Sequence, residues 1–358
     1  MVVVAGAGMG GLVAAARLRE RGVDVTVVEK GDRSGGSMVL SSGVVWRHRS
    51  LDAFHDECSA GDRELQRTIV GRLDECLDWL EALGAPVVRR ETGNPHTLGR
   101  RFDPHWMTDA LVQRVGRIRF GEPLVELGDD VTVLATGGFG AALAERLGLP
   151  VRGNPRSVGD GLRLAVGHGA TLSRGMDEFY GRALPAPPAR ISPDDFVRLS
   201  QVYGRHAFVA DEMGTAVQGD VAWHEADLVQ RIARLPGGQA WYILDSDALD
   251  LPLGEGTVAD RVEAARAAGG TVVDPRELPF DVPGSASVAV HIVASVTHTV
   301  GGIAVDVDAR ALREDRSPIE GLYAVGVDAG GVAAGGYSSG LAAALVLGFA
   351  AAESIADG

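Results

Sequence analysis

The sequence lacks the residues that several protein classes depend on. Aromatic residues make up only 5% of the 358 residues, and Cys58 and Cys76 are the only cysteines. Two cysteines without a C-x-x-C spacing exclude a disulfide framework and a cysteine-rich zinc site. The nine histidines show no metal-ligand spacing either, and no C-x-x-C-H motif is present. We therefore expect no metal site and no fused haem domain.

Positive charge and long apolar runs are also scarce. The formal net charge is −14, which argues against general nucleic-acid binding because that requires a basic face. The apolar run from Leu341 to Ala351 is far shorter than the roughly 20 residues that span a bilayer. We expect a buried helix there and no membrane span. Met1 leads directly into an apolar strand with no room for a signal peptide, so we expect a cytoplasmic protein.

The first thirty residues contain a strong positive signal. Val2 to Ala5 is a short apolar run, typical of a buried parallel strand. Gly6 to Gly11 follows at once and fits G-x-G-x-x-G. Leu12 to Arg21 is predicted to be a helix, and the alternation from Val23 predicts a second strand that ends in Glu29. The order of strand, glycine turn, helix, strand and acid predicts a dinucleotide site.

Each residue type in this stretch has a physical role in such a site. Gly6 permits the tight turn, Gly8 allows the pyrophosphate to approach the backbone, and Gly11 allows helix and strand to pack closely. The helix N-terminus offers unpaired N–H groups to the phosphates. Glu29 would accept hydrogen bonds from the adenosine ribose. A glycine turn that serves only packing is the alternative, which the acid at this spacing disfavours.

The loop that leaves the second strand is rich in small and hydroxylated residues. A loop at the carboxyl end of this strand is expected to lie over the cofactor crevice, although a plain surface loop is the alternative. Its expected cofactor contacts are Lys30, Gly36, Ser37, Ser42 and Gly43.

Further along, the pattern separates core elements from irregular segments. Asp62 to Leu83 has leucines at helical spacing and is predicted to be a core helix. The glycines and prolines between Arg89 and Trp106 predict an irregular segment. Arg182 to Asp195 holds four prolines and is predicted to be a stiff linker. Beyond it we expect short strands such as Ala240 to Leu244 and helices such as Val258 to Ala268.

Five motifs, in this order, resemble the flavoprotein family of succinate dehydrogenase and fumarate reductase. V-L-A-T-G-G is similar to the second FAD contact of two-dinucleotide-binding-domain flavoproteins. The others resemble the family's G-D-G helix, its H-T-x-G-G, its G-L-Y-A-x-G-E with Asp in place of Glu, and its flavin-ring contact S-G-L. In the order just given, the five motifs lie at Val133 to Gly138, Gly159 to Gly161, His298 to Gly302, Gly321 to Asp328 and Ser339 to Leu341.

The resemblance implies an α/β fold in which a Rossmann-like FAD-binding domain is interrupted by an α+β cap domain. The expected domains are 1–182 and 297–358 for FAD binding and 183–296 for the cap, which closes over the flavin in the family. FAD is expected rather than NAD, because a nicotinamide dehydrogenase has no use for the motifs at Ala135 to Gly138 and Gly321 to Leu341. The FAD is expected to be non-covalent, because Ser34 to Gly43 contains no histidine. The further cofactor contacts implied are Leu124, Ala135, Thr136, Gly137, Gly138, Asp160, Gly326, Asp328, Ser339, Gly340 and Leu341.

The reaction implied is hydride transfer between flavin N5 and a carbon–carbon bond next to a carbonyl or carboxylate, with dehydrogenation favoured over reduction. The segment from Gly330 to Gly340 lacks the arginine that clamps a carboxylate in fumarate reductases, and Tyr242 to Leu251 lacks their proton-donating arginine. A small dicarboxylate is therefore disfavoured as substrate. Gly336 and Tyr337, followed by small residues, more closely resemble the 3-ketosteroid Δ1-dehydrogenase and tricarballylate dehydrogenase branches. A cyclic ketone or a carboxylic acid is the expected substrate class, and the electron acceptor is unknown.

Four residues are the candidate catalytic groups. Tyr337 matches a tyrosine that hydrogen-bonds the substrate carbonyl in the ketosteroid enzymes, and packing under the flavin is its alternative role. His298 matches a substrate-binding histidine of the dicarboxylate branch, with a structural hydrogen bond as the alternative. Tyr180 could act as an acid or base and Arg182 could meet an anionic group, unless both are solvated linker residues.

Two other functions remain open from the sequence. A flavin-dependent hydroxylase or oxidase would use a related FAD domain, but the H-T-x-G-G motif and the position of the cap argue against it. A catalytically silent FAD-binding protein is conceivable because the clamp arginines are missing.

Overall fold

The computed structural model describes all residues, 1–358, and the chain forms two compact units. The first unit comprises Met1–Ala142, Asn154–Phe179 and His298–Gly358, and the second comprises Leu143–Gly153 and Tyr180–Thr297. The sequence assigned 143–153 to the FAD-binding part. The segment groups with the second unit because the Arg152 N–H donates to the Val296 carbonyl (2.7 Å) and the Val296 N–H donates to the Pro150 carbonyl (3.0 Å).

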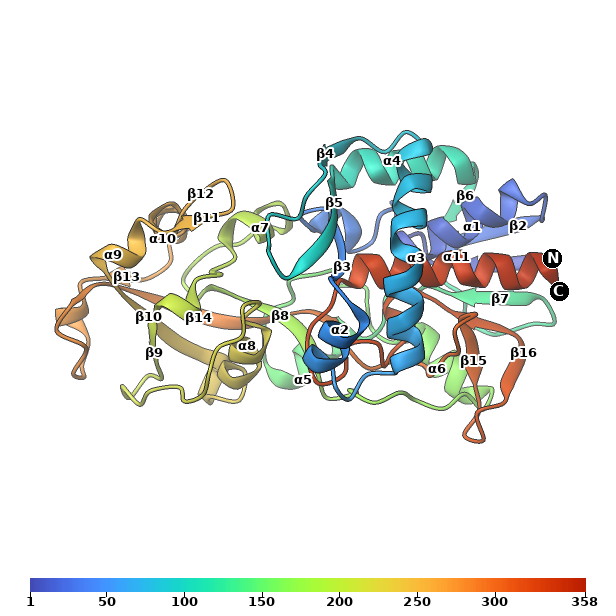
Figure 1. The fold of residues 1–358 in the computed structure, drawn as a ribbon. Coiled ribbons are helices and arrows are strands. Elements are labelled where there is room, and N and C mark those ends of the chain that lie inside the picture. The colour runs from blue at the N-terminus through green and yellow to red at the C-terminus, as the bar shows by residue number, and fades with distance from the viewer. The chain divides into compact units, whose positions relative to one another are not determined.

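A six-stranded sheet forms the centre of the first unit (Figure 1). Its order is β15 (Arg310–Leu312), β16 (Pro318–Ala324), β7 (Val131–Leu134), β1 (Val2–Ala5), β2 (Val25–Glu29) and β6 (Ile118–Phe120). All neighbours are parallel except β15 and β16. Val2 is in register with both Val25 and Val131, so the carboxyl ends of β1, β2 and β7 lie at one edge. The predicted α/β class is confirmed.

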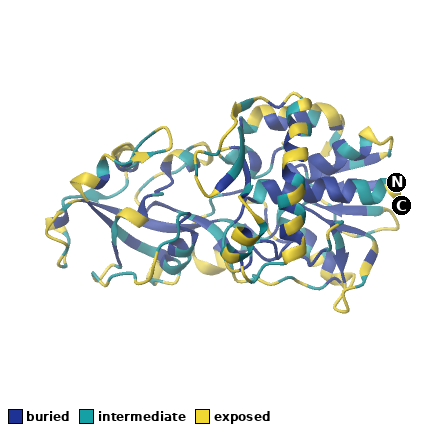
Figure 2. Cartoon of the chain, viewed as in Figure 1, coloured by how far each residue is buried: buried dark blue, intermediate teal, exposed yellow.

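Several α-helices complete the first unit, and the first of them packs against strands β1 and β7 of the sheet. They are α1 (Met9–Glu20), α2 (Leu51–Glu57), α3 (Arg63–Ala82), α4 (Pro104–Val115), α6 (Asp160–Gly167) and α11 (Gly340–Asp357), with α5 (Gly140–Leu147) crossing the boundary between the units. Helix α11 packs against α1 and α3. It is apolar and long enough to cross a membrane, but its residues from Ala342 to Ala352 are buried in the unit (Figure 2). It is therefore the core helix that the sequence predicted.

The segment 89–106 is more regular than predicted. It contains β5 (Thr97–Phe102), which pairs with β3 (Val44–His48) and with β4 (Val87–Arg89), and it contains the start of α4. Gly99 lies inside β5, where a Cβ would be 2.1 Å from the Val45 carbonyl oxygen. The glycine that indicated a loop is there because two strands approach closely, which a single sequence cannot reveal.

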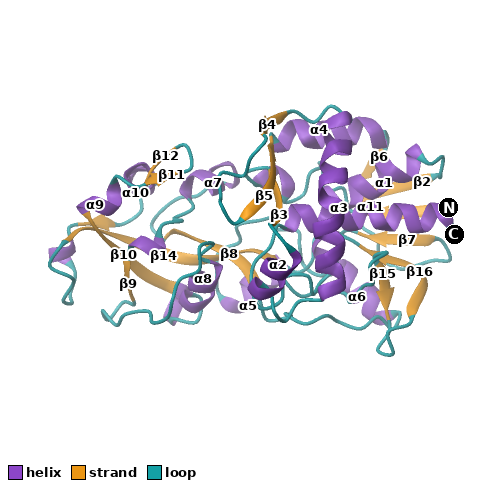
Figure 3. Ribbon diagram, viewed as in Figure 1, coloured by secondary structure: helices purple, strands orange, loops and turns teal.

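A second sheet organises the other unit (Figure 3). Strands β13 (Val272–Val273), β14 (Ala286–Thr299), β10 (Gln239–Asp245) and β9 (Phe208–Ala210) follow one another, and β8 (Phe179–Pro185) also pairs with β14. The remaining elements are α7 (Phe196–Leu199), α8 (Ala226–Ile232), α9 (Ser246–Leu249), β11 (Pro252–Leu253), β12 (Gly256–Thr257) and α10 (Val258–Ala267). The strand predicted at 240–244 and the helix predicted at 258–268 are confirmed.

The predicted linker is wrong over its first part. Arg182 to Pro185 belongs to β8 and not to a stiff connection. Proline is tolerated here because Pro185, which has no N–H to donate, is the last residue of a strand that pairs only with β14. The Ala186 N–H still donates to the His291 carbonyl (3.0 Å). Tyr180 and Arg182 therefore lie in a paired strand, and the solvated-linker alternative for them is excluded.

Candidate functional site

The glycine turn after β1 leaves an exposed helix start. Gly6 has φ +113°, and a Cβ there would be 2.2 Å from the Ala135 carbonyl oxygen, so the turns after β1 and β7 touch. Gly8 is the N-cap of α1, where no side chain caps the helix and no acidic residue occupies the first turn. A Cβ at Gly8 would meet nothing within 4 Å. The N–H groups of this helix start can therefore bind an anionic group.

Glu29 ties the end of β2 to this turn. Its carboxylate accepts from the Ala7 N–H (2.9 Å) and from the Gly31 N–H (2.7 Å). A carboxylate has more lone pairs than these two bonds use, so a ribose hydroxyl can be added without breaking either one. Glu29 thus stabilises the conformation of the glycine turn at the position where the sequence analysis predicts the ribose.

The loop after β2 lies over the same turn. The Gly35 N–H donates to the Ala7 carbonyl (2.8 Å), and a Cβ at Gly36 would be 3.3 Å from Gly8 Cα. Lys30 forms an ion pair with Asp160 at the start of α6, and Ser37 Oγ accepts from the Asn154 N–H (3.0 Å). Residues predicted from separate motifs are therefore brought together.

Three of the predicted contacts have mainly structural surroundings. A Cβ at Gly43 would be 2.0 Å from the Phe102 carbonyl oxygen, so the glycine permits the approach of β5. Ser42 accepts from Arg101 Nε through its carbonyl (3.3 Å). Leu124 packs, half-buried, against the main core.

Asp328 holds the turn after β7 from inside. Its carboxylate accepts from the Thr136 N–H, from Thr136 Oγ1 (3.0 Å) and from the Gly138 N–H (3.0 Å). Thr136 Oγ1 in turn accepts from the Gly161 N–H at the start of α6 (3.0 Å). Burial raises the pKa of the Asp328 carboxyl, and the backbone donors oppose this shift. The sequence offered Asp328 as a cofactor contact, but its observed partners are the protein's own backbone and Thr136.

Several positions near these turns are too close to neighbouring atoms to carry a side chain, which explains why they are glycines. A Cβ at Gly161 would lie 2.7 Å from Thr136 Oγ1, and a Cβ at Gly137 would lie 2.9 Å from Ser157 Oγ. Gly326 stands beside the first turn of α1, since a Cβ at Gly10 would be 3.0 Å from the Gly326 nitrogen. The turn after β7, Asp328 and the start of α6 are thus joined by hydrogen bonds, and the first glycine turn approaches Ala135 and Gly326 closely.

The start of α11 lies beside His298. Ser339 is the N-cap, and its Oγ accepts from the Ala342 N–H (3.2 Å). A Cβ at Gly340 would lie 3.0 Å from His298 Nε2. His298 Nδ1 is 3.1 Å from the Thr299 carbonyl, and because a carbonyl oxygen only accepts, Nδ1 carries a hydrogen and donates it there. Leu341 is half-buried against the core.

Tyr337 stands next to this helix start in an aromatic cluster. Its ring centroid is 5.3 Å from that of Trp46, and its carbonyl is 3.1 Å from His48 Nε2. A Cβ at Gly336 would be 1.9 Å from the Glu57 carbonyl oxygen, so a glycine is required immediately before the tyrosine. Sequence reasoning missed Trp46 and His48. Their spacing of two residues in β3, which puts both side chains on one face, was the available signal.

Tyr180 and Arg182 meet in the second unit. Arg182 Nε donates to Tyr180 Oη (2.7 Å), and the guanidinium carbon lies 5.1 Å from the centre of the Tyr180 ring. Arg182 Nη1 also donates to the His224 carbonyl, and the Arg182 carbonyl accepts from Ser295 Oγ (2.6 Å). The two candidates form a fixed pair.

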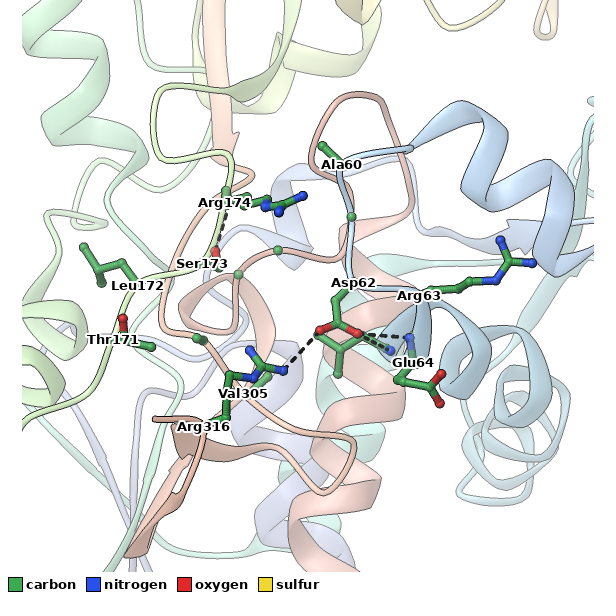
Figure 4. A pocket seen from close by; sticks show the side chains of 15 residues that line it. Ala60, Asp62, Arg63, Glu64, Thr171, Leu172, Ser173, Arg174, Val305 and Arg316 are labelled. Atoms are coloured by element: carbon green, nitrogen blue, oxygen red, sulfur yellow. Dashed lines mark hydrogen bonds and ion pairs between the residues drawn. The ribbon is translucent and has the colours of Figure 1, made fainter. Parts of the chain in front are cut away.

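A cavity of about 470 Å³ lies elsewhere in the first unit (Figure 4). Asp62 at the start of α3, Ser173 and Arg316 contribute to its wall, and Arg316 pairs with Asp62 (3.5 Å). None of the predicted cofactor or catalytic residues lines it. The cavity is therefore separate from the surface formed by the glycine turns.

The glycine turns and helix starts of the first unit define an α/β protein that can hold a dinucleotide. The open helix start at Gly8, where a Cβ would meet no atom within 4 Å, the acid at the end of β2 and the second turn held by Asp328 fit an FAD molecule. The sequence matches the FAD binding domain family over residues 1–130 and 122–341. The chain belongs to this family.

Curated relatives are distant. A probable fumarate reductase, Ifc3, of Shewanella frigidimarina (strain NCIMB 400) is 23% identical over an alignment covering 92% of this chain and 70% of that protein. The NADH:fumarate oxidoreductase of Klebsiella pneumoniae (strain 342) is 22% identical over 97% of this chain, which spans only 46% of that protein.

Solved structures share the fold across nearly the whole chain. A flavocytochrome c3 fumarate reductase in its open conformation has a TM-score of 0.72 at 22% identity, covering 100% of this chain and 78% of that one. The 3-ketosteroid Δ1-dehydrogenase of Sterolibacterium denitrificans, solved with 1,4-androstadiene-3,17-dione, has a TM-score of 0.74 at 17% identity and covers 99% of both chains. The fold is therefore shared with both kinds of enzyme.

Two glycines of the first turn separate cofactor binding from folding. Gly8→Ala adds a methyl group that meets no protein atom, so we expect an unchanged melting temperature without FAD and an FAD affinity lowered by about 10-fold or more, since the pyrophosphate needs close approach. Gly11→Ala puts its Cβ 2.0 Å from the Gly6 carbonyl oxygen and should lower the melting temperature itself. Thermal unfolding and FAD titration of both variants measure this. Equal FAD affinity of Gly8→Ala and wild type would contradict the assignment.

Asp328→Asn removes an acceptor from a buried network. One backbone N–H of the turn after β7 then loses its partner, and we expect the free energy of unfolding to fall by about 1–3 kcal/mol. Asp308→Asn, an exposed carboxylate paired with Arg310, is the matched control and should change stability by less than about 0.5 kcal/mol. Urea denaturation of both variants gives the comparison, and equal effects would mean that the Asp328 network is not stabilising.

Proposed function

We propose that this protein is an FAD-dependent oxidoreductase that acts on a carbon–carbon bond next to a carbonyl or carboxylate, with dehydrogenation favoured over reduction. The main support is the corner of the first unit where His298 lies against Gly340 and Tyr337 precedes the same helix start. The resemblance assigns the flavin ring to that helix start. The names of the relatives and of the structural neighbours agree with this class of reaction.

The cofactor is proposed to be non-covalent FAD. When bound, FAD supplies the two-electron acceptor of the dehydrogenation. Gly6, Gly8 and Glu29 would hold its adenosine diphosphate part, and the turn from Ala135 to Gly138 would contact it next. No histidine occurs from Ser34 to Gly43, the segment in which the family's covalent link would be expected.

The protein's own groups then have two tasks. In a dehydrogenation, one carbon loses a hydride, the neighbouring carbon loses a proton, and a carbon–carbon double bond forms. The Tyr337 hydroxyl would donate to the carbonyl oxygen and stabilise negative charge on it while the proton leaves. Tyr180 would take the proton as a phenolate and become a neutral phenol, and Arg182, whose Nε–H donates to Tyr180 Oη, would stabilise the negative charge of that phenolate.

A ketone is favoured over a small dicarboxylate as the substrate. No arginine occurs between Gly330 and Gly340, next to the helix start where a carboxylate would need a bidentate partner. The aromatic pair Trp46 and Tyr337 provides apolar area with one hydroxyl group at the same place. A ring system with a single carbonyl matches this chemistry.

Anaerobic flavin spectroscopy tests the reaction class. We expect 4-androstene-3,17-dione or a simpler cyclic ketone to bleach the oxidised flavin within seconds, and succinate to leave it unchanged. Oxygen consumption coupled to hydroxylation would instead favour a hydroxylase. No bleaching by any donor, together with no reoxidation of dithionite-reduced flavin by fumarate or 1,4-androstadiene-3,17-dione, would contradict the proposal and favour a catalytically silent FAD-binding protein.

Tyr337→Phe tests the assigned carbonyl donor. Loss of one donor to a developing oxyanion should lower kcat by about 10²- to 10³-fold while FAD remains bound. Tyr323→Phe is the matched control, because the Tyr323 ring lies in the core and its hydroxyl forms a hydrogen bond with Ser354 Oγ (3.3 Å). Unchanged turnover in Tyr337→Phe would assign the tyrosine to packing.

A further inference from the structure

A buried polar cluster in the second unit has no role in the proposed reaction as described above. Glu225, Tyr203 and Tyr242 are 3%, 0% and 0% exposed. They surround the short 3-10 helix η3 (Gly204–His206) and the start of α8. A buried carboxylate is costly and is kept only where partners compensate for its lost hydration. The partners of Glu225 therefore indicate its purpose.

The backbone at Glu225 is unusual. Its φ is +58°, in the left-handed region that non-glycine residues rarely adopt. Such a conformation persists where the surrounding structure imposes it. The preceding residue, His224, directs its carbonyl to Arg182 Nη1, and its Nδ1 accepts from the Ala226 N–H (3.0 Å). The turn at Glu225 is thus the element that presents this carbonyl to Arg182.

The Glu225 side chain ties this turn to the loop that contains Gly204 and Arg205. Its carboxylate accepts from the Gly204 N–H (3.1 Å) and the Arg205 N–H (3.2 Å). Tyr242 Oη is buried beside this loop without a hydrogen-bond partner, and a Cβ at Gly204 would lie 2.7 Å from it. Glu225 therefore links the loop at Gly204 to the start of α8. Position 204 must be glycine because a side chain there would clash with Tyr242.

The charges around Glu225 come from three directions. Burial raises the pKa of the Glu225 carboxyl, while Arg182 of β8 and Arg205 of η3 oppose the shift. Tyr203 and Tyr242 also face it, and burial together with the Glu225 charge raises the pKa of both phenols, so they stay neutral. Arg182 and Arg205 are therefore the two cations that favour the charged form of this carboxylate.

We propose that Glu225 is a positioning residue for the Arg182–Tyr180 pair. It holds the turn that presents the His224 carbonyl to Arg182, and its negative charge balances the guanidinium. The catalytic consequence rests on the proposed function, whereas the structural and electrostatic coupling between Glu225 and Arg182 does not.

The coupling is tested on the FAD-loaded protein by thermal unfolding between pH 4.5 and 9. A carboxyl with a raised pKa in the folded state loses stabilisation as the pH rises from its unfolded pKa to its folded pKa. The melting temperature of Glu225→Gln relative to wild type should therefore rise over this window and then level off. Glu263→Gln, an exposed glutamate paired with Arg266, is the control and should show no such rise.

The same step in an Arg182→Gln background separates coupling from simple burial. Without the guanidinium the carboxylate is less favoured, so the step should move to higher pH, whereas Arg182→Lys, which keeps the charge, should leave it near its wild-type position. A step at the same pH in all three backgrounds would overturn the proposal. If Glu225→Gln does not fold, the pH-dependent infrared band of the buried carboxyl in the wild-type, Arg182→Gln and Arg182→Lys proteins provides the same comparison.

Turnover and structure complete the test. With a substrate that bleaches the wild-type flavin, Glu225→Gln should lower kcat by about 10- to 100-fold with little change in KM and should alter the pH profile, as expected when a reacting group is misplaced. In a crystal structure of this variant, Arg182 should no longer donate to the His224 carbonyl. An intact hydrogen bond between them, with an unchanged pH profile, would overturn the proposal. If no substrate reacts with wild type, the proposed function fails while the stability series still decides the Glu225–Arg182 coupling.

Discussion

The hydrogen bonds of the buried Asp328 carboxylate are the constraint that holds the candidate site of the first unit together. The carboxylate binds the turn after β7 through Thr136 and Gly138, and Thr136 extends the network to the start of α6 at Gly161. These segments are far apart in the sequence, and residues 180–297, which form most of the second unit, lie between two of them. Residues 298–358 return to the first unit after the second unit, and their strand β16 must pair with β7, which lies far earlier in the sequence. A buried acid with several fixed donors defines the position of this segment, because any shift would leave charge and N–H groups unpaired.

The sequence predicted the features that depend on neighbours along the chain. The first strand, the glycine turn, helix α11 and the strand and helix at 240–244 and 258–268 follow from local periodicity and turn chemistry. The α/β class followed from the order of these elements and from the resemblance. Gly99 and Pro185 were misleading, since both usually mark loops but here lie in strands whose partners are distant in sequence. Only tertiary pairing resolves such cases.

The candidate site shows the same division. The motifs identified Gly8, Glu29 and Thr136, but no local pattern could show that the carboxylates of Glu29 and Asp328 accept from backbone N–H groups. Nor could it reveal the aromatic partners of Tyr337 or the buried surroundings of Glu225. These contacts arise where segments from different parts of the chain converge. Residue types with a definite chemical role were therefore predictable, while their partners were not.

The central claim is that the first unit is an FAD site, and binding of FAD to the apoprotein measures it most directly. Calorimetric titration at fixed salt and pH should give one FAD bound per chain and no measurable binding of NAD, and acid precipitation of the complex should release all the flavin into solution. Flavin that remains with the precipitate would contradict the proposed non-covalent attachment. Absence of FAD binding by a folded apoprotein would contradict the central claim itself.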